Sequence, residues 1–469
     1  MEDWQMHFIG RERELADLNR YYSMNGFQFP VIYGRRRIGK TTLIRQFIRD
    51  KRAAYYMATE QNPEEQLKAC SKIVLDVTKY TGMPKGAVFP SWETLFDYIG
   101  SASEERFIFV IDEYPYLAKK MPEISSVIQK VIDGKWKDSQ LFLILCGSSM
   151  SFMEKQVLGY QSPLYGRRTC QFKLKGLSYY ESIQFFPSWS DEEKLLAYGV
   201  CGGVPQYLYF FSKFTSLRDA VISEFMTPGG HLREEPQNLL KQELRDPSAY
   251  YDIIAAIAGG AGRQNEIADK VGKERNMLAN YLSNLSSLDV IEKCHPVGER
   301  STRKVTYRLK DNLYRFWFLF IPKTLSLIEM GMGERAYDSI IEPHLSDFFG
   351  QVFETVSLQY IERMMVNGTI KELYTEFGKW WGTDPERKEQ TDIDVVFMND
   401  NEILAGECKW KTDPITYDVY ETLKYRCTII QGKRKPHYAL FSKAGFTDTV
   451  KKKASDCLLV DMAAICSWK

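Results

Sequence analysis

Gly34-Arg35-Arg36-Arg37-Ile38-Gly39-Lys40-Thr41 matches the pattern G-x-x-x-x-G-K-[ST] without a gap. An apolar stretch at residues 29–33 precedes this motif, and a helical pattern at residues 42–48 follows it. This strand–loop–helix setting favours a phosphate-binding P-loop over the alternative of a basic surface turn. In such a loop the backbone N–H groups point at phosphate oxygens, and the helix N-terminus behind them favours negative charge.

The P-loop motif predicts a nucleotide site with defined side-chain roles. We expect the Lys40 ammonium to act on the β- and γ-phosphates of ATP, and the Thr41 hydroxyl to bind Mg²⁺. The nucleotide-binding residues expected from this segment are Gly34, Arg35, Arg36, Arg37, Ile38, Gly39, Lys40, Thr41 and Thr42.

Two carboxylates follow a second apolar run, residues 107–111. A continuous apolar run is typical of a parallel strand that is buried on both faces. We expect Asp112 to hold Mg²⁺, directly or through water, and Glu113 to polarise the attacking water as a catalytic residue. An ordinary strand with a polar end is the alternative, and the position of this run after a P-loop disfavours it.

Polar residues after a third apolar run, residues 141–146, are further candidates. Ser148 and Ser149 could sense the γ-phosphate, or the Gly-Ser pair could simply terminate the strand. Arg167 and Arg168 could supply a catalytic arginine finger, in cis or in trans, because Arg pairs with phosphate in a planar, bidentate way. A solvated basic loop is the alternative for these two arginines.

Several ordered motifs together resemble the prokaryotic "archaeal ATPase" family, AAA-type ATPases near the signal-transducing STAND class. These motifs are Phe-Ile-Gly-Arg-Glu-Arg-Glu at residues 8–14, the P-loop, Ile-Asp-Glu at 111–113, Ser-Pro-Leu-Tyr-Gly-Arg at 162–167 and Gly-Gly-Val-Pro at 202–205. The resemblance covers roughly residues 1–240. It implies that Ile9, Gly10 and Arg11 lie near the adenine, and that Pro205 lies in a helical lid over the nucleotide; a plain loop is the alternative for the Gly-x-Pro segment.

The middle of the chain has the pattern of a winged helix-turn-helix. Apolar periodicity predicts helices at residues 251–257, 264–270 and 273–288, and strands at 290–293 and 304–309. The third helix of that fold can enter the DNA major groove. The basic and polar candidates for DNA contact are Lys273, Arg275, Asn276, Arg300, Arg303 and Lys304. A protein-packing module that couples nucleotide state to the rest of the chain is the alternative.

The C-terminal part carries the residue types of a metal-dependent nuclease. Two predicted strands, residues 392–397 and 403–410, flank a turn signal, so antiparallel pairing can bring Asp394 beside Glu407 and Lys409. Asp394 and Glu407 could hold Mg²⁺, Lys409 could stabilise developing charge, and Glu354 on an upstream helix could add a ligand. This order resembles the PD-(D/E)xK nuclease core, which the archaeal ATPase family often carries at its C-terminus together with a Trp-Trp-Gly segment, here at 380–382. A surface hairpin with paired charges is the alternative.

Length and composition bound these expectations. The chain has 469 residues, too many for one ordinary core, with 44% hydrophobic and 26% charged residues. Its net charge of +1 gives no global electrostatic case for nucleic acid, so any DNA contact depends on local patches. Nine scattered cysteines, no signal peptide and no apolar run near the roughly 20 residues of a membrane span predict a cytoplasmic protein.

We therefore expect an α/β protein in four parts. A P-loop core with a parallel sheet would span residues 1–160, a helical lid 161–245, a winged helix 246–312, and a nuclease-like α/β domain with connecting helices 313–469. The expected function is ATP hydrolysis with Mg²⁺, coupled to DNA binding or cleavage, with a homo-oligomer as one possible state. The alternative is a nucleotide-dependent protein-interaction switch whose nuclease-like domain is inert.

Overall fold

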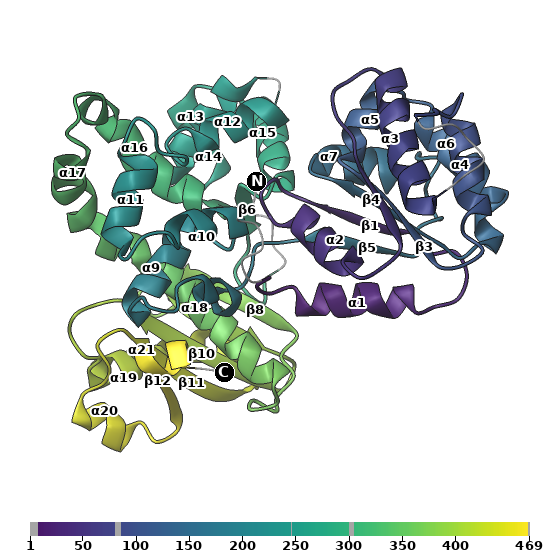
Figure 1. The fold of residues 1–469 in the computed structure, drawn as a ribbon. Helices are drawn as coiled ribbons and strands as arrows, with labels where there is room; N and C mark the ends of the chain where they lie inside the picture. Colours follow the sequence, from purple (N-terminus) through teal and green to yellow (C-terminus); the bar gives the residue numbers. More distant parts are fainter. Residues whose placement is uncertain (1–7, 80–85, 245, 300–303, 468–469) are drawn as a thin grey trace. The chain divides into compact units, whose positions relative to one another are not determined.

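The computed structural model describes residues 8–79, 86–244, 246–299 and 304–467 (Figure 1). Within them the chain forms two compact units. The first consists of the chain up to Leu177 together with Val204–Gln206, and the second of Ser178–Gly203 and the chain from Tyr207 onward.

A five-stranded parallel sheet in the order β2-β3-β4-β1-β5 forms the centre of the first unit. Its strands are β1 (Pro30–Gly34), β2 (Ala53–Met57), β3 (Phe107–Asp112), β4 (Leu141–Gly147) and β5 (Cys170–Leu174). Its helices are α1 (Glu12–Tyr22), α2 (Lys40–Ile48), α3 (Pro63–Thr78), α4 (Trp92–Ser101), α5 (Tyr114–Lys120), α6 (Ile124–Asp133) and α7 (Met150–Phe152). Every residue of β1, β3 and β4 is buried, as expected of parallel strands covered on both faces.

The last strand of this sheet corrects the expected boundary of the core. We placed the end of the P-loop core at residue 160, but β5 pairs with β1 along its whole length, from Pro30 opposite Cys170 to Gly34 opposite Leu174. β5 lies at the sheet edge, and its burial alternates instead of being continuous. The pattern that identified β3 and β4 is therefore absent from it.

The expected lid is part of the second unit rather than a separate domain. Its elements are α8 (Tyr179–Ser182), α9 (Asp191–Cys201), α10 (Pro205–Phe211), α11 (Leu217–Phe225) and α12 (Glu235–Glu243). Helix α9 contacts two later helices, α16 (Asn312–Glu329) and α18 (Leu345–Val366). At Gly199 of α9 a Cβ atom would lie 2.3 Å from the Phe349 ring of α18, so this crossing requires a glycine.

The middle region has the expected element order. Helices α13 (Pro247–Ala258), α14 (Gln264–Val271) and α15 (Arg275–Ser287) precede β6 (Ile291–Cys294) and β7 (Thr306–Leu309). The two strands pair antiparallel, with Ile291 opposite Leu309. Arg300 and Arg303, which we expected at the hairpin tip, lie outside the described residues.

The C-terminal part contains a second five-stranded sheet, in the order β12-β11-β10-β9-β8. The strands are β8 (Glu376–Thr383), β9 (Gln390–Met398), β10 (Glu402–Lys409), β11 (Lys435–Ser442) and β12 (Cys457–Asp461). The helices around it are α17 (Gly333–Ala336), α18, α19 (Tyr417–Gln431), α20 (Asp448–Lys453) and α21 (Met462–Ser467). β8–β9 and β9–β10 pair antiparallel, whereas β10–β11 and β11–β12 pair parallel. Among the described residues, no helix combines the length and apolar character that crossing a membrane requires.

Candidate functional site

The P-loop joins β1 to α2 at the carboxyl end of the first sheet. Lys40 is buried, and its Nζ donates to the carbonyl oxygens of Gly34 at 3.0 Å and Arg35 at 2.9 Å. Gly39 has a φ of 89°, a left-handed conformation that favours glycine at the start of α2. At Gly34, the first glycine of the motif, a Cβ atom would lie 2.6 Å from the Leu174 carbonyl oxygen of β5, so this glycine permits a close backbone approach.

Thr41 and Asp112 meet beside the loop. The Thr41 hydroxyl donates to Asp112 Oδ2 at 2.8 Å, and the Tyr55 hydroxyl donates to the same oxygen at 2.5 Å. Burial raises the pKa of Tyr55, and the Asp112 charge raises it further, so this hydroxyl remains a donor. A buried carboxylate beside a hydroxyl is the oxygen donor set that Mg²⁺ prefers, so these residues fit the expected ion. No sequence motif singles out Tyr55.

Glu113 is held in a defined position by Ser148. Its φ of 51° places it in the left-handed region between β3 and α5. Its Oε2 accepts a hydrogen bond from the Ser148 hydroxyl at 2.7 Å and from the Ser148 backbone N–H at 3.2 Å. We expected Ser148 to sense the γ-phosphate, and its described contact is with the expected catalytic carboxylate. Ser149 precedes α7 and makes no side-chain capping bond there.

Arg11 and Pro205 both reach the P-loop from distant parts of the sequence. Arg11 is buried at the start of α1, and its guanidinium donates to the carbonyl oxygen of Ile38 at 3.1 Å and also to that of Lys175. The Pro205 ring lies 3.6 Å from the place a Cβ atom would take on Gly39. Both residues therefore lie at the expected nucleotide site, with Ile9 and Gly10 directly before Arg11 in the chain.

Arg167 and Arg168 do not lie at this site. They precede β5, where Thr169 donates its backbone N–H to Phe29 just before β1, so they lie at the amino end of the parallel strands. The P-loop lies at the carboxyl end. Arg167 also forms a bidentate ion pair with Asp133, at 2.8 and 2.7 Å. This position corrects the expectation of an arginine finger in cis and leaves only the trans form.

In the second unit, Lys379 stands among three carboxylates. Its Nζ lies 3.1 Å from Glu354 Oε1, 3.0 Å from Asp392 Oδ2 and 2.9 Å from Asp394 Oδ1. Burial and the Asp394 charge raise the pKa of Glu354 to about 7, although Lys379 opposes the shift. Burial alone would lower the pKa of Lys379, but the neighbouring carboxylates raise it, so its ammonium stays charged. The sequence did not indicate Lys379.

Glu407 and Lys409 lie next to this group on β10. Lys409 Nζ lies 2.5 Å from Glu407 Oε1, and Arg426 of α19 lies 3.3 Å from Glu407 Oε2. Gly406 lies opposite Val395 in the β9–β10 pairing, so Glu407 and Asp394 are neighbours, and burial and the Asp394 charge raise the pKa of Glu407. The Cys408 backbone N–H donates to Asp394 Oδ2 at 3.1 Å and links β10 to that carboxylate.

The side chains as they stand do not fit the expected three-carboxylate metal site. Glu354, Asp394 and Glu407 do not form a group of ligand atoms within 4.8 Å of one another in the described part of the chain. The Lys379 ammonium pairs instead with Glu354 and Asp394 and supplies a positive charge between them. Glu354 pairs with Lys379 in this structure, and its role as a metal ligand stays a prediction.

Comparisons with known proteins agree with the P-loop geometry. Residues 8–211 match an ATPase domain predominantly from Archaea, and residues 317–422 match archaeal and bacterial proteins of unknown function. Uncharacterized protein MJECL04 of Methanocaldococcus jannaschii is 32% identical over 460 residues, which cover 97% of this chain and 99% of that protein. The chain belongs to this family of archaeal-type ATPases.

A solved structure gives the same fold for much of the chain. The Walker-type ATPase PABY2304 of Pyrococcus abyssi has a TM-score of 0.53 and 21% sequence identity, covering 66% of this chain and 96% of that one. The family match and the P-loop together support nucleotide binding and ATPase activity, which confirms the expectation for the first unit.

Proposed function

We propose that this ATPase couples its nucleotide state to DNA binding or cleavage by its second unit. The observation that carries the proposal is the arrangement of the second sheet: a helix with Glu354, then antiparallel β8, β9 and β10, then α19 and the parallel strand β11. The expected PD-(D/E)xK residues Asp394, Glu407 and Lys409 lie on adjacent strands of this sheet.

In the first unit, the positions of the P-loop residues and of the two carboxylates at the end of β3 support specific roles in ATP hydrolysis. Lys40 would bind the β- and γ-phosphates, and Glu113, held by Ser148, would orient and polarise the attacking water. Mg²⁺ at Thr41 and Asp112 would neutralise phosphate charge when bound. Arg167 or Arg168 of a second copy could act in trans, which would require a homo-oligomer.

DNA contact by the second unit would involve the winged-helix-like elements. Arg275 begins α15 and is exposed, and Lys273 lies next to it, 5.3 Å from the Tyr281 ring. Lys304 pairs with Glu299 at 2.5 Å, so its charge is partly compensated. Phosphate contacts from such a small set would give weak, salt-sensitive binding.

The second candidate is a nucleotide-dependent protein-interaction switch whose C-terminal domain does not cut DNA. The ion pairs of Lys379 favour it, because an internal ammonium already balances Glu354 and Asp394.

Incubation of the purified chain with linear and supercoiled DNA separates the two candidates. Reactions contain Mg²⁺ or Mn²⁺, with and without ATP, and compare the wild type with Asp394→Ala, Lys409→Ala and the exposed control Glu421→Ala. Cleavage that is lost only in the first two variants supports a nuclease. No cleavage under any of these conditions rejects the nuclease and leaves the switch.

A further inference from the structure

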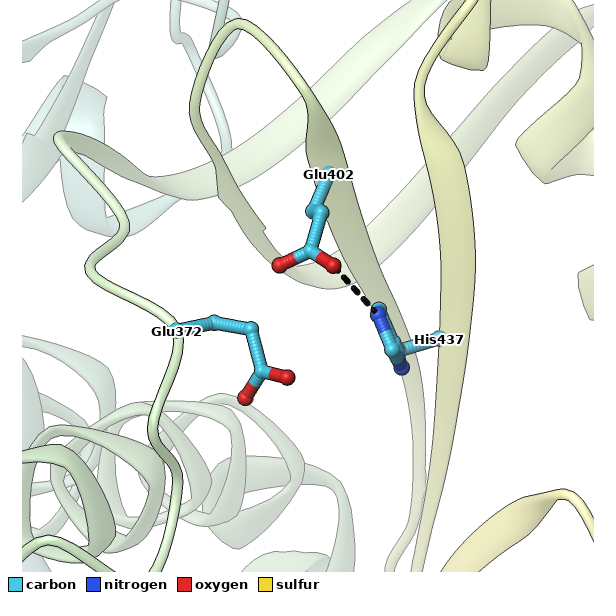
Figure 2. A group of neighbouring side chains, drawn as sticks. All are labelled: Glu372, Glu402 and His437. Carbon is cyan, nitrogen blue, oxygen red and sulfur yellow. Dashed lines mark ion pairs between the residues drawn. The ribbon is translucent and has the colours of Figure 1, made fainter.

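A second group of ligating side chains, Glu372, Glu402 and His437, is drawn in Figure 2. It lies at the end of β10 away from Glu407. Glu402 begins β10, His437 lies on the adjacent strand β11, and Glu372 lies between α18 and β8. One oxygen of each carboxylate and one imidazole nitrogen lie within 4.8 Å of one another. Among the described residues, no other three His, Cys, Asp or Glu side chains come together in this way.

The His437 ring has a nitrogen that needs a partner. Its Nε2 atom is buried and has no hydrogen bond in the described structure. Glu402 Oε1 lies 3.6 Å away, too far for a hydrogen bond. Figure 2 shows the carboxylates of Glu402 and Glu372 beside this ring. A buried ring nitrogen left unsatisfied is costly, so an additional group that accepts its lone pair would stabilise the site.

The two carboxylates beside the ring have no Lys or Arg partner among the described residues, and His437 is the only ion-pair partner of Glu402 there. Burial raises the pKa of the adjacent Tyr374, and the charges of Glu372 and Glu402 raise it further, so both carboxylates act on the same small region. Two negative charges and a nitrogen lone pair are the surroundings that a divalent cation prefers.

The spacing suits zinc. Bonds of about 2.0–2.2 Å to nitrogen and oxygen place two ligands of a tetrahedral zinc about 3.4 Å apart. The 3.6 Å between His437 Nε2 and Glu402 Oε1 is close to that separation. Glu372 lies outside helix and strand, so its carboxylate can close the remaining gap without moving the sheet.

We propose that Glu372, Glu402 and His437 bind one Zn²⁺ ion, with water as the fourth ligand. The ion would link the segment between α18 and β8 to the first residues of β10 and β11, and this link would stabilise the second unit. Glu402 and Glu407 are five residues apart on one strand, about 16 Å, so this site is separate from the Lys379 group. The proposal is independent of any nuclease activity.

The test is Zn²⁺ binding to the full chain, first stripped of metal and then titrated in excess Mg²⁺. We expect the wild type to bind one more zinc per chain than His437→Ala, and Glu402→Gln and Glu372→Gln to weaken that zinc by roughly tenfold or more. His344→Ala, which removes an imidazole at the start of α18, should bind zinc like the wild type. Asp394→Asn should also bind like the wild type.

Thermal unfolding gives a second measurement on the same proteins. Zinc at about 100 times its dissociation constant should raise the Tm of the wild type by roughly 5 °C, and His437→Ala should show no rise. A Tm of metal-free His437→Ala equal to that of the metal-free wild type would show that the second unit of this variant is folded. Equal zinc stoichiometry, affinity and Tm gain in the wild type, His437→Ala and Glu402→Gln would overturn the proposal, as would loss of the zinc in Asp394→Asn.

Discussion

At the scale of single residues, Glu113 depends on its neighbour Ser148. The Glu113 carboxylate receives two hydrogen bonds from Ser148, one from the hydroxyl and one from the backbone N–H. The backbone bond survives removal of the side chain, whereas the shorter hydroxyl bond does not. We therefore propose that Ser148 positions Glu113, with a smaller effect on hydrolysis than Glu113 itself.

Glu113→Gln should retain ATP binding and lower kcat by about 10²–10⁴-fold, because an amide cannot polarise water as a carboxylate does.

Ser148→Ala should lower kcat by about tenfold, because Glu113 then loses one hydrogen bond to its charged carboxylate. Lys40→Ala should abolish nucleotide binding. Steady-state kinetics and calorimetric ATP titration measure these effects, and normal turnover by Glu113→Gln would contradict the assignment.

Lys379 balances the charges of three neighbouring carboxylates, so we expect it to stabilise the second unit. Lys379→Met would leave Glu354, Asp392 and Asp394 close together without their shared ammonium. We expect the free energy of unfolding to fall by roughly 2–4 kcal/mol, since the largely buried carboxylates of Glu354 and Asp394 lose their shared ammonium. Lys433→Met, at an exposed lysine of the same unit, should change it by less than about 0.5 kcal/mol. If urea unfolding shows the same change in unfolding free energy for Lys379→Met and Lys433→Met, the ion pairs of Lys379 do not stabilise the second unit.

At the scale of elements, the crossing of α9 and α18 ties the expected lid to the C-terminal domain. Gly199→Ala would place a methyl group 2.3 Å from the Phe349 ring, which is buried and cannot move freely. We expect a loss of about 1–3 kcal/mol of stability from overpacking. Gly350→Ala on α18 meets open space and should raise stability by about 0.5–1 kcal/mol. Chemical denaturation that shows no difference between the two variants would contradict this packing.

Sequence patterns located the elements whose burial is strongly periodic or continuous. β3, β4, α13 and α14 lie within a few residues of their expected positions, because a buried face constrains which residue types they contain. β5 was missed because an edge strand is buried on alternate residues only.

The residues of the candidate sites also fall into those that sequence patterns predict and those that they do not. Lys40, Thr41 and Asp112 follow from motifs with fixed spacing, whereas Tyr55 and Lys379 reach their sites only through tertiary packing. The position of Arg167 opposite the P-loop depends on sheet topology, which its local sequence does not encode.

At the scale of the whole molecule, the central claim is coupling between the nucleotide and the second unit. Residues Val204–Gln206 belong to the first unit although the chain on both sides belongs to the second. Pro205 in this short segment lies beside Gly39 of the P-loop. We propose that a change at the P-loop reaches α10 through this segment, because Pro205 and Gln206 are the first residues of that helix.

Coupling requires that ATP and DNA alter each other's affinity by the same factor. The direct measurement is fluorescence anisotropy of labelled duplex DNA, titrated with the wild type and with Lys40→Ala, each with and without Mg-ATP. We predict that ATP changes the DNA Kd of the wild type by at least about fivefold and leaves that of Lys40→Ala unchanged. A wild-type Kd that is the same with and without ATP, or a shift that persists in Lys40→Ala, would contradict the account.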